Sequence, residues 1–247
     1  MMSKISHGWA VANLEARIAA HLHAWDKAKG TGQPLAQATY PFVTISRETG
    51  CGGVAVALRL SEILNERCRP FFVWVPYDHE LLDRVARELH LQRGVVEAID
   101  QRRRDEMAEL FDSILTHRPS DGLIVRKMAE VIRSLAIHGH AILVSRGSHL
   151  LTQDLKTALH VRLTGPREWR IQNIAEERGL SHDEAVLTID QAEKERQHYL
   201  STYFVMDPAH PFSFDLAVDN SRFNVAQVAE LIFTALGVRF GETLVGA

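Results

Sequence analysis

The chain has 247 residues, of which 46% are hydrophobic and 24% charged, which is the balance of an ordinary globular domain rather than a disordered chain. A net charge of −3 gives no bulk attraction to nucleic acid or to an anionic membrane surface, so we expect neither as a partner. No apolar run approaches the roughly 18 residues of a membrane span, and the N-terminus carries charges where a signal peptide is apolar.

Residues 9–27 begin the chain with a helical pattern, because apolar side chains recur three or four positions apart. The repeating positions are Val11, Leu14, Ile18, Leu22 and Trp25. The stretch KGTGQP that follows has the composition of a linker. We therefore predict an amphipathic helix and linker over 1–39, separate from a main domain over 40–240. Such a helix would pack on that domain or form a homodimer contact.

The main domain alternates strands with helices. Strands are expected at 41–46, 70–75, 140–145, 159–164 and 214–219. Helices are expected at 54–67, 78–90, 95–117, 121–137, 166–178, 181–203 and 224–236, and Ser181 with Glu184 forms a capping-box pattern. Most of these strands are apolar on both faces, which indicates a five-stranded parallel sheet covered by helices on both sides. Ligands of such sheets bind at the carboxyl ends of the strands.

A glycine-rich loop, Ser46 to Gly53 (SRETGCGG), follows the first strand and opens a helix. Its amides and the helix N-terminus could cradle a phosphate. Aligned with a Walker loop, it has Gly53 at the lysine position and Val54 at the position of the magnesium-binding hydroxyl. It also satisfies the dinucleotide pattern GxGxxG/A, with Asp78 placed after the second strand. The loop alone leaves both interpretations open.

Basic residues elsewhere favour phosphoryl transfer. Arg146 directly follows a buried strand, and Arg170 lies on the helix after the next strand. Lys194 and Arg196 lie farther on, on a polar helix. Several cations at one sheet edge suit the negative charge of a transferring phosphoryl group. A dehydrogenase transfers no phosphoryl group and does not need so many cations.

Cysteine and histidine give little sign of a metal. Two cysteines, Cys51 and Cys68, fit a reducing cytoplasm and cannot form a disulfide framework. Thirteen histidines include no HExxH motif. We expect a cytoplasmic protein without a structural metal site.

Taken in order, six segments resemble the cytidylate kinase-like family of P-loop proteins over about 41–237. These are ISRETGCGG, YDHELLDRVAREL, AILVSRGSHLL, LHVRLTGPREWRI, IDQAEKERQHYLSTYF and FDLAVDNSRF. The resemblance implies a P-loop NTPase-like three-layer sandwich with a lid that carries arginines. It also implies ATP with Mg²⁺ as the donor and CMP or dCMP as the acceptor.

The resemblance also suggests residue roles. Donor phosphates would be held by Gly50, Cys51, Gly52, Gly53 and Val54, with Arg170 nearby. Arg146 and Asp78 would contact the acceptor, although Asp78 could equally be a helix cap. Lys194 and Arg196 would act with Arg146 on the transferring phosphate.

The chain departs from true cytidylate kinases at two points. The loop lysine and the hydroxyl residue after it are missing, and Arg146 is followed by Gly147 rather than an aspartate. We hypothesise that Arg47 supplies the missing charge. Three functions stay open: a nucleoside monophosphate kinase, a nucleotide-binding regulator without catalysis, and a Rossmann-type dinucleotide-binding protein.

Overall fold

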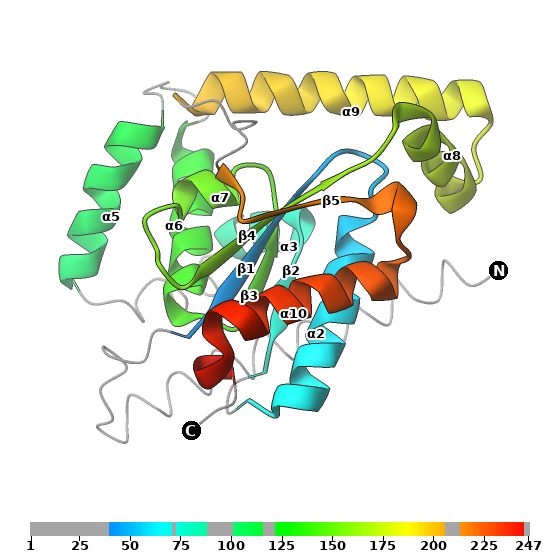
Figure 1. Cartoon of the computed structure of the whole chain (residues 1–247). Coiled ribbons are helices and arrows are strands. Elements are labelled where there is room, and N and C mark those ends of the chain that lie inside the picture. The colour runs from blue at the N-terminus through cyan, green and yellow to red at the C-terminus, as the bar shows by residue number, and fades with distance from the viewer. Residues whose placement is uncertain (1–39, 71–72, 88–100, 116–121, 206–212, 245–247) are drawn as a thin grey trace.

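The computed structural model describes residues 40–70, 73–87, 101–115, 122–205 and 213–244 (Figure 1). In these ranges, five parallel strands form one sheet in the order β2-β3-β1-β4-β5. They are β1 (Phe42–Arg47), β2 (Val75–Tyr77), β3 (Ala141–Val144), β4 (Ala158–Thr164) and β5 (Leu216–Asp219). The predicted parallel α/β sheet is confirmed. The N-terminal helix and linker fall outside the described residues and stay a prediction.

Alternate side chains of the central strands enter two separate cores, as the two-residue repeat of a strand requires. On β1, Phe42 packs into one core, and Val43 and Ile45 pack into the other. On the neighbouring strand β3, Leu143 and Ile142 divide in the same way. Burial on both faces explains why these strands are apolar throughout.

Helices cover both faces of the sheet and give the three predicted layers (Figure 1). One face is covered by α2 (Gly53–Cys68) and α10 (Val225–Leu244), which pack on each other. The other is covered by α3 (His79–Arg87), α5 (Gln101–Ile114), α6 (Gly122–His138) and α7 (Ser148–Leu151).

A helical hairpin of α8 (Arg167–Arg178) and α9 (His182–Tyr203) stands apart from these layers. It has a small apolar core of its own, formed by Ile171, Ile174, Ala185 and Ile189. The predicted capping box of Ser181 and Glu184 is present at the start of α9. The long α9 runs along one end of the molecule, with α8 beside the loop that follows β1 (Figure 1).

The second strand lies later than predicted, at Val75–Tyr77 instead of 70–75. The side chain of Asn65 on α2 accepts a hydrogen bond from the Trp74 amide at 2.7 Å and donates one to the Trp74 carbonyl at 3.0 Å. These bonds occupy the backbone of Trp74, so pairing begins where Val75 N–H donates to the His140 carbonyl at 3.0 Å. The strand therefore begins at Val75, later in the sequence than predicted.

Several helix ends also differ from the sequence prediction. The short α7 was not predicted, and α10 extends to Leu244 instead of 236, with a kink at Phe240. The early parts of the predicted helix 95–117 lie outside the described residues.

The strand order distinguishes between the two interpretations of the glycine loop. In a Rossmann sheet the first strand lies beside the second, in the order 3-2-1-4-5-6. Here β3 lies between β1 and β2. The Rossmann-type interpretation of the loop is therefore wrong. Among the described helices, none has the length and apolarity to cross a membrane.

Candidate phosphate-binding site

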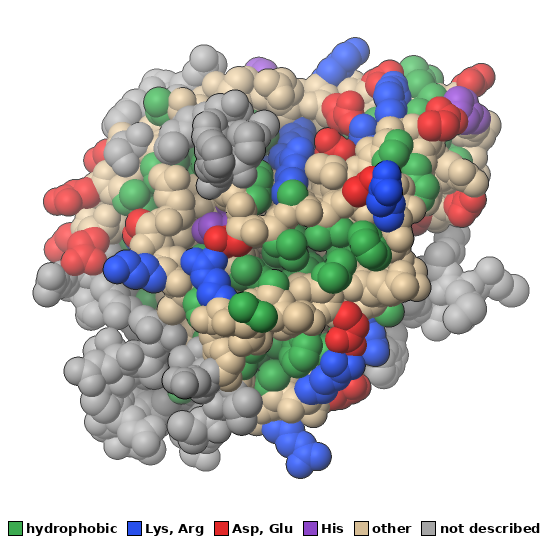
Figure 2. Space-filling view, in the orientation of Figure 1, with side chains coloured by type: hydrophobic (Ala, Val, Ile, Leu, Met, Phe, Trp, Pro, Cys, Tyr) green, Lys and Arg blue, Asp and Glu red, His purple; other side chains and the backbone are tan. Residues whose placement is uncertain are grey.

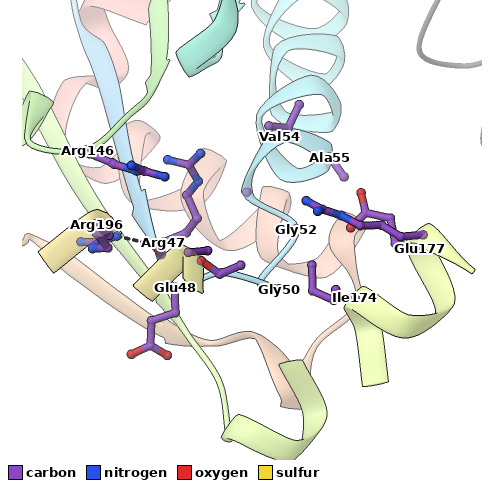
Figure 3. A pocket seen from close by; sticks show the side chains of 14 residues that line it. Arg47, Glu48, Gly50, Gly52, Val54, Ala55, Arg146, Ile174, Glu177 and Arg196 are labelled. Atoms are coloured by element: carbon purple, nitrogen blue, oxygen red, sulfur yellow. Dashed lines mark hydrogen bonds between the residues drawn. The ribbon is translucent and has the colours of Figure 1, made fainter. Parts of the chain in front are cut away.

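A cavity of about 300 Å³ opens beside the glycine loop, at the carboxyl end of β1 (Figure 3). The loop and α2, the end of β3, and the hairpin α8–α9 all contribute to its wall. The lining residues are Arg47, Glu48, Thr49, Gly50, Gly52, Gly53, Val54, Ala55, Arg146, Ile174, Glu177, Arg178, Ala192 and Arg196. The sequence analysis predicted a ligand site at this edge of the sheet.

Two loop glycines adopt backbone angles that other residues rarely take. Gly50 has φ +92°, and a Cβ there would lie 2.6 Å from the Arg170 carbonyl oxygen. Gly52 has φ +61° and is the N-cap of α2, without a side-chain hydrogen bond to the first turn. The amides that open α2, from Gly53 to Ala55, therefore meet the cavity uncapped, as an anion-binding helix start requires.

Three predicted arginines converge on this cavity from three elements, namely Arg47 from β1, Arg146 after β3 and Arg196 from α9. Arg196 donates to the Arg47 carbonyl oxygen at 2.5 Å and to Ser46 Oγ at 3.3 Å, which holds it against the loop. The guanidinium groups of Arg47 and Arg146 extend toward each other (Figure 3). Within the described part of the chain, none of the three forms an ion pair with a carboxylate.

Burial and neighbouring positive charge lower the pKa of two of these arginines. Burial, together with the charges of three neighbouring arginines, lowers the pKa of Arg196 to about 10. Burial also lowers the pKa of Arg47, and the charge of Arg146 lowers it further against the opposing effect of Asp78. Uncompensated cations in a partly buried cavity favour binding of an anion.

The side chain of Arg47 lies over Gly53, the position that holds lysine in a Walker loop. A Cβ built on Gly53 would come within 3.2 Å of both Cγ and Cδ of Arg47. The glycine therefore leaves room for the arginine, and a positive charge reaches the cavity from β1 instead of α2. This geometry agrees with the hypothesis that Arg47 replaces the loop lysine.

Arg170, predicted to bind nucleotide, is instead mostly engaged by protein groups. Its guanidinium donates to Glu193 Oε1 at 2.5 Å and to the Thr49 carbonyl at 3.3 Å, and Nε lies 3.5 Å from Glu48 Oε2. Glu48 also accepts from the Gly165 amide at 3.2 Å and lies 3.7 Å from Arg162. Arg170 does not line the cavity; with Glu48 it anchors the loop to α8 and α9.

Three other predicted residues also lie outside the cavity lining. Cys51 is buried in the core, burial raises its thiol pKa to about 11, and its amide donates to the Glu48 carbonyl at 3.2 Å. Lys194 is exposed on α9. Asp78 caps α3 by accepting from the Leu81 amide at 2.8 Å, yet its charge still acts on Arg47.

Sequence analysis missed several side chains that hold the loop. Asn173 on α8 donates to the Gly50 carbonyl at 3.1 Å, and Asn220 after β5 donates to the Cys51 carbonyl at 2.8 Å. Asn173 lies three residues after Arg170, so a shared helix face was a signal for it. Asn220 directly follows a predicted strand, so its place at the carboxyl edge of the sheet was a signal for it.

Gly147 fixes the position of Arg146. It has φ +90°, and a Cβ there would lie 2.6 Å from Cζ of Phe204 at the end of α9. The turn after β3 therefore packs directly on the ring of Phe204. Arg146 is held between the loop and α9 by this close contact.

The start of α2 lacks the hydroxyl that holds Mg²⁺ in a Walker loop, although Thr49, Glu48 and Glu177 bring oxygen atoms to the cavity lining. Val54 stands where a hydroxyl ligand is needed, and Mg²⁺ prefers oxygen ligands. The described residues contain no group of three or more His, Cys, Asp and Glu side chains that could hold a metal ion.

Comparisons with known proteins give one family match and several similar folds. The family model described as "Cytidylate kinase-like family" matches residues 42–222. An uncharacterized protein from Eubacterium ventriosum ATCC 27560 has a similar fold, with a TM-score of 0.61 and 21% identity over 81% of this chain and 99% of that one. A shikimate kinase from Acinetobacter baumannii matches at a TM-score of 0.44 and 14% identity, over 83% and 97% of the two chains.

No curated protein matches the sequence. The family match covers most of the chain, including the glycine loop, the three arginines and the hairpin. The chain belongs to the cytidylate kinase-like family.

Proposed function

We propose that the protein is an ATP-dependent nucleoside monophosphate kinase that phosphorylates CMP or dCMP. The observation that carries the proposal is the convergence of Arg47, Arg146 and Arg196 on the uncapped start of α2. Membership of a kinase-like family supports the same reaction class. The cytoplasm, where ATP is abundant and thiols stay reduced, is the proposed location.

Each group has a separate role in this proposal. The amides from Gly53 to Ala55 hold the donor phosphates, and Arg47 neutralises them in place of lysine. Arg196 reaches the transferring phosphoryl group from α9. No covalent intermediate is needed, because positioning and charge stabilisation account for transfer.

Arg146 is assigned to the acceptor side. Its charge acts on His79 at the start of α3: burial lowers the pKa of His79, and Arg146 and Arg47 lower it further. Asp78 precedes His79 and also acts on Arg47. An acceptor phosphate between Arg146 and Arg47 would place its nucleoside toward α3.

One observation favours a second candidate, a nucleotide-binding protein without transferase activity. Gly53 and Val54 remove both side chains that usually contact the β/γ-phosphates and the metal. Binding could persist on the backbone amides while transfer is lost.

A coupled assay of ADP formation tests the proposal against a panel of CMP, dCMP, UMP, AMP and GMP. We expect ADP to form with CMP and dCMP, and Arg47→Ala protein purified in the same way should be inactive. ADP formation that survives in the variant would show a contaminating kinase. Binding of ATP without turnover on any acceptor would support the second candidate.

A further inference from the structure

Four arginines and two glutamates line the cavity, so its charged side chains are positive on balance. Arg47, Arg146 and Arg196 line it from three separate elements. Val54 presents only methyl groups where a metal-binding hydroxyl would be. Charge that usually comes from a metal is thus built into the side chains.

Two carboxylates close to the loop, Glu48 and Asp78, are engaged by protein groups, whereas Glu177 on α8 lines the cavity. Glu48 accepts from the Gly165 amide at 3.2 Å and lies 3.5 Å from Arg170 and 3.7 Å from Arg162. Asp78 accepts from the Leu81 amide at 2.8 Å. Moving either toward a cation would leave these groups without their partner, at a cost of about 1–3 kcal/mol for each buried donor.

The arginines are also positioned before any ligand arrives. Arg196 is fixed by its bonds to the Arg47 carbonyl and Ser46 Oγ, at 2.5 Å and 3.3 Å. Arg47 packs over Gly53. Its Cγ and Cδ lie 3.2 Å from the point where a Cβ on Gly53 would be. A divalent cation beside these fixed positive groups would be repelled unless phosphate separated them.

We infer that the protein binds the polyphosphate of its nucleotide in the metal-free form, with Arg47 and Arg196 in the charge-neutralising place of a divalent cation. The inference rests on the proposed function, because it concerns the donor of that reaction. It names a ligand class, the free nucleoside triphosphate, that differs from the metal complex that kinases of this fold are expected to use.

The test is calorimetric titration of the full chain with ATP, once with excess Mg²⁺ and once with EDTA. We expect the two dissociation constants to agree within about threefold. Inorganic tripolyphosphate in EDTA should compete with ATP, because the phosphates supply the contacts. Binding with Mg²⁺ that weakens more than about tenfold in EDTA would overturn the inference.

Matched variants locate the charge. Arg47→Met should weaken ATP binding in EDTA by about tenfold or more. Arg59→Met removes an equal charge from the exposed face of α2, where Arg59 pairs with Glu62 at 2.8 Å, and should leave binding unchanged. Equal loss in both variants would show a general charge effect and contradict the assignment.

A loop exchange provides the reverse test. The triple variant Arg47→Ala, Gly53→Lys, Val54→Thr restores the usual lysine and hydroxyl and should bind ATP about tenfold better with Mg²⁺ than without it. Its melting temperature shows whether it is folded. Failure of the native chain to bind ATP in either buffer would overturn the proposed function and the inference together, whereas loss in EDTA alone overturns only the inference.

Discussion

Two groups of arginines surround the glycine loop, and they differ in what neutralises them. Arg162 and Arg170 share Glu48, and Arg170 also pairs with Glu193 at 2.5 Å. Arg47, Arg146 and Arg196 line the cavity and, among the residues the structure describes, have no ion pair with a carboxylate. The first group is neutralised within the protein, and under the proposed function the second would be neutralised by a bound anion.

Position on the surface gives no hint of this difference. Charged side chains of both signs lie beside each other over much of the visible face, and an arginine there does not by itself indicate a site (Figure 2). What distinguishes the two groups of arginines is whether each forms an ion pair with a carboxylate. We therefore expect the paired arginines to affect stability and the cavity arginines to affect ligand binding and turnover.

The largest effect should come from Arg146→Met. Loss of one arginine that stabilises a transferring phosphoryl group should lower kcat by about 1,000-fold, or about 4 kcal/mol. The melting temperature should stay nearly constant, because no ion pair is broken. Arg222→Met, which removes an exposed cation paired with Asp219 at 3.2 Å, is the control and should keep full activity.

Activity of Arg146→Met within about threefold of the native value would place Arg146 with the structural arginines and remove the distinction.

Glu48→Gln tests the paired group. The change removes the charge that Arg162 and Arg170 share, and we expect a loss of about 2–3 kcal/mol in the free energy of unfolding. For a domain of this size that lowers the melting temperature by about 8 °C. Thermal unfolding followed by circular dichroism measures it.

Glu230→Gln is the matched control, because Glu230 forms an exposed pair with Arg67 at 2.5 Å. It should cost less than about 1 kcal/mol. Equal shifts in the two variants would mean that Glu48 does not anchor the loop.

The pH dependence of stability tests a residue of the sheet, away from the cavity. Burial lowers the pKa of His160 on β4 to about 4, and Thr44 Oγ1 lies 2.8 Å from its Nδ1. The unfolded chain takes up this proton near its ordinary pKa while the folded chain does not, so stability falls as pH drops below about 6.5. Between pH 7.5 and 5 the loss from this residue should be about 2 kcal/mol.

Unfolding in urea at several pH values measures this slope, and His160→Asn should make it shallower. His140, whose pKa burial also lowers to about 4, should account for part of the slope that remains. The exposed His198, changed in the same way, should leave it as steep. A slope unaffected by His160→Asn would mean that the imidazole is protonated in the folded protein.

The smallest expected effect has the opposite sign. Arg47→Met removes a partly buried cation that repels Arg146, and keeps the aliphatic packing over Gly53. Without ligand, we expect the free energy of unfolding to rise by about 1 kcal/mol and the melting temperature by about 3 °C. Scanning calorimetry of the native chain and the variant would show it, and a lower melting temperature would place Arg47 among the structural residues.

Sequence reasoning worked where local pattern decides the structure. The strand β1, the glycine turn and the capping box of Ser181 all follow from neighbours a few residues apart. It identified Arg47 and Arg146 from their places at the ends of strands, and Arg196 from the family resemblance. The convergence of these three residues depends on the order β3-β1-β4, which the chain order does not state.

The remaining features depend on partners distant in sequence. The shift of β2 results from Asn65 binding Trp74, and the anchoring by Arg170 results from Glu48 and Glu193. Local patterns cannot show which of several arginines finds a carboxylate. Asp78 illustrates this, because helix cap and acceptor contact have the same local signature.

The contact between Gly147 and Phe204 has a consequence for the history of the sequence. No side chain fits at residue 147 while the Phe204 ring keeps its position, because a Cβ there would lie 2.6 Å from Cζ of Phe204. Homologues that replace this glycine should therefore carry a smaller residue at the position of Phe204, and the two positions should change as a pair. An alignment in which they vary independently would mean that the end of α9 packs differently in those relatives.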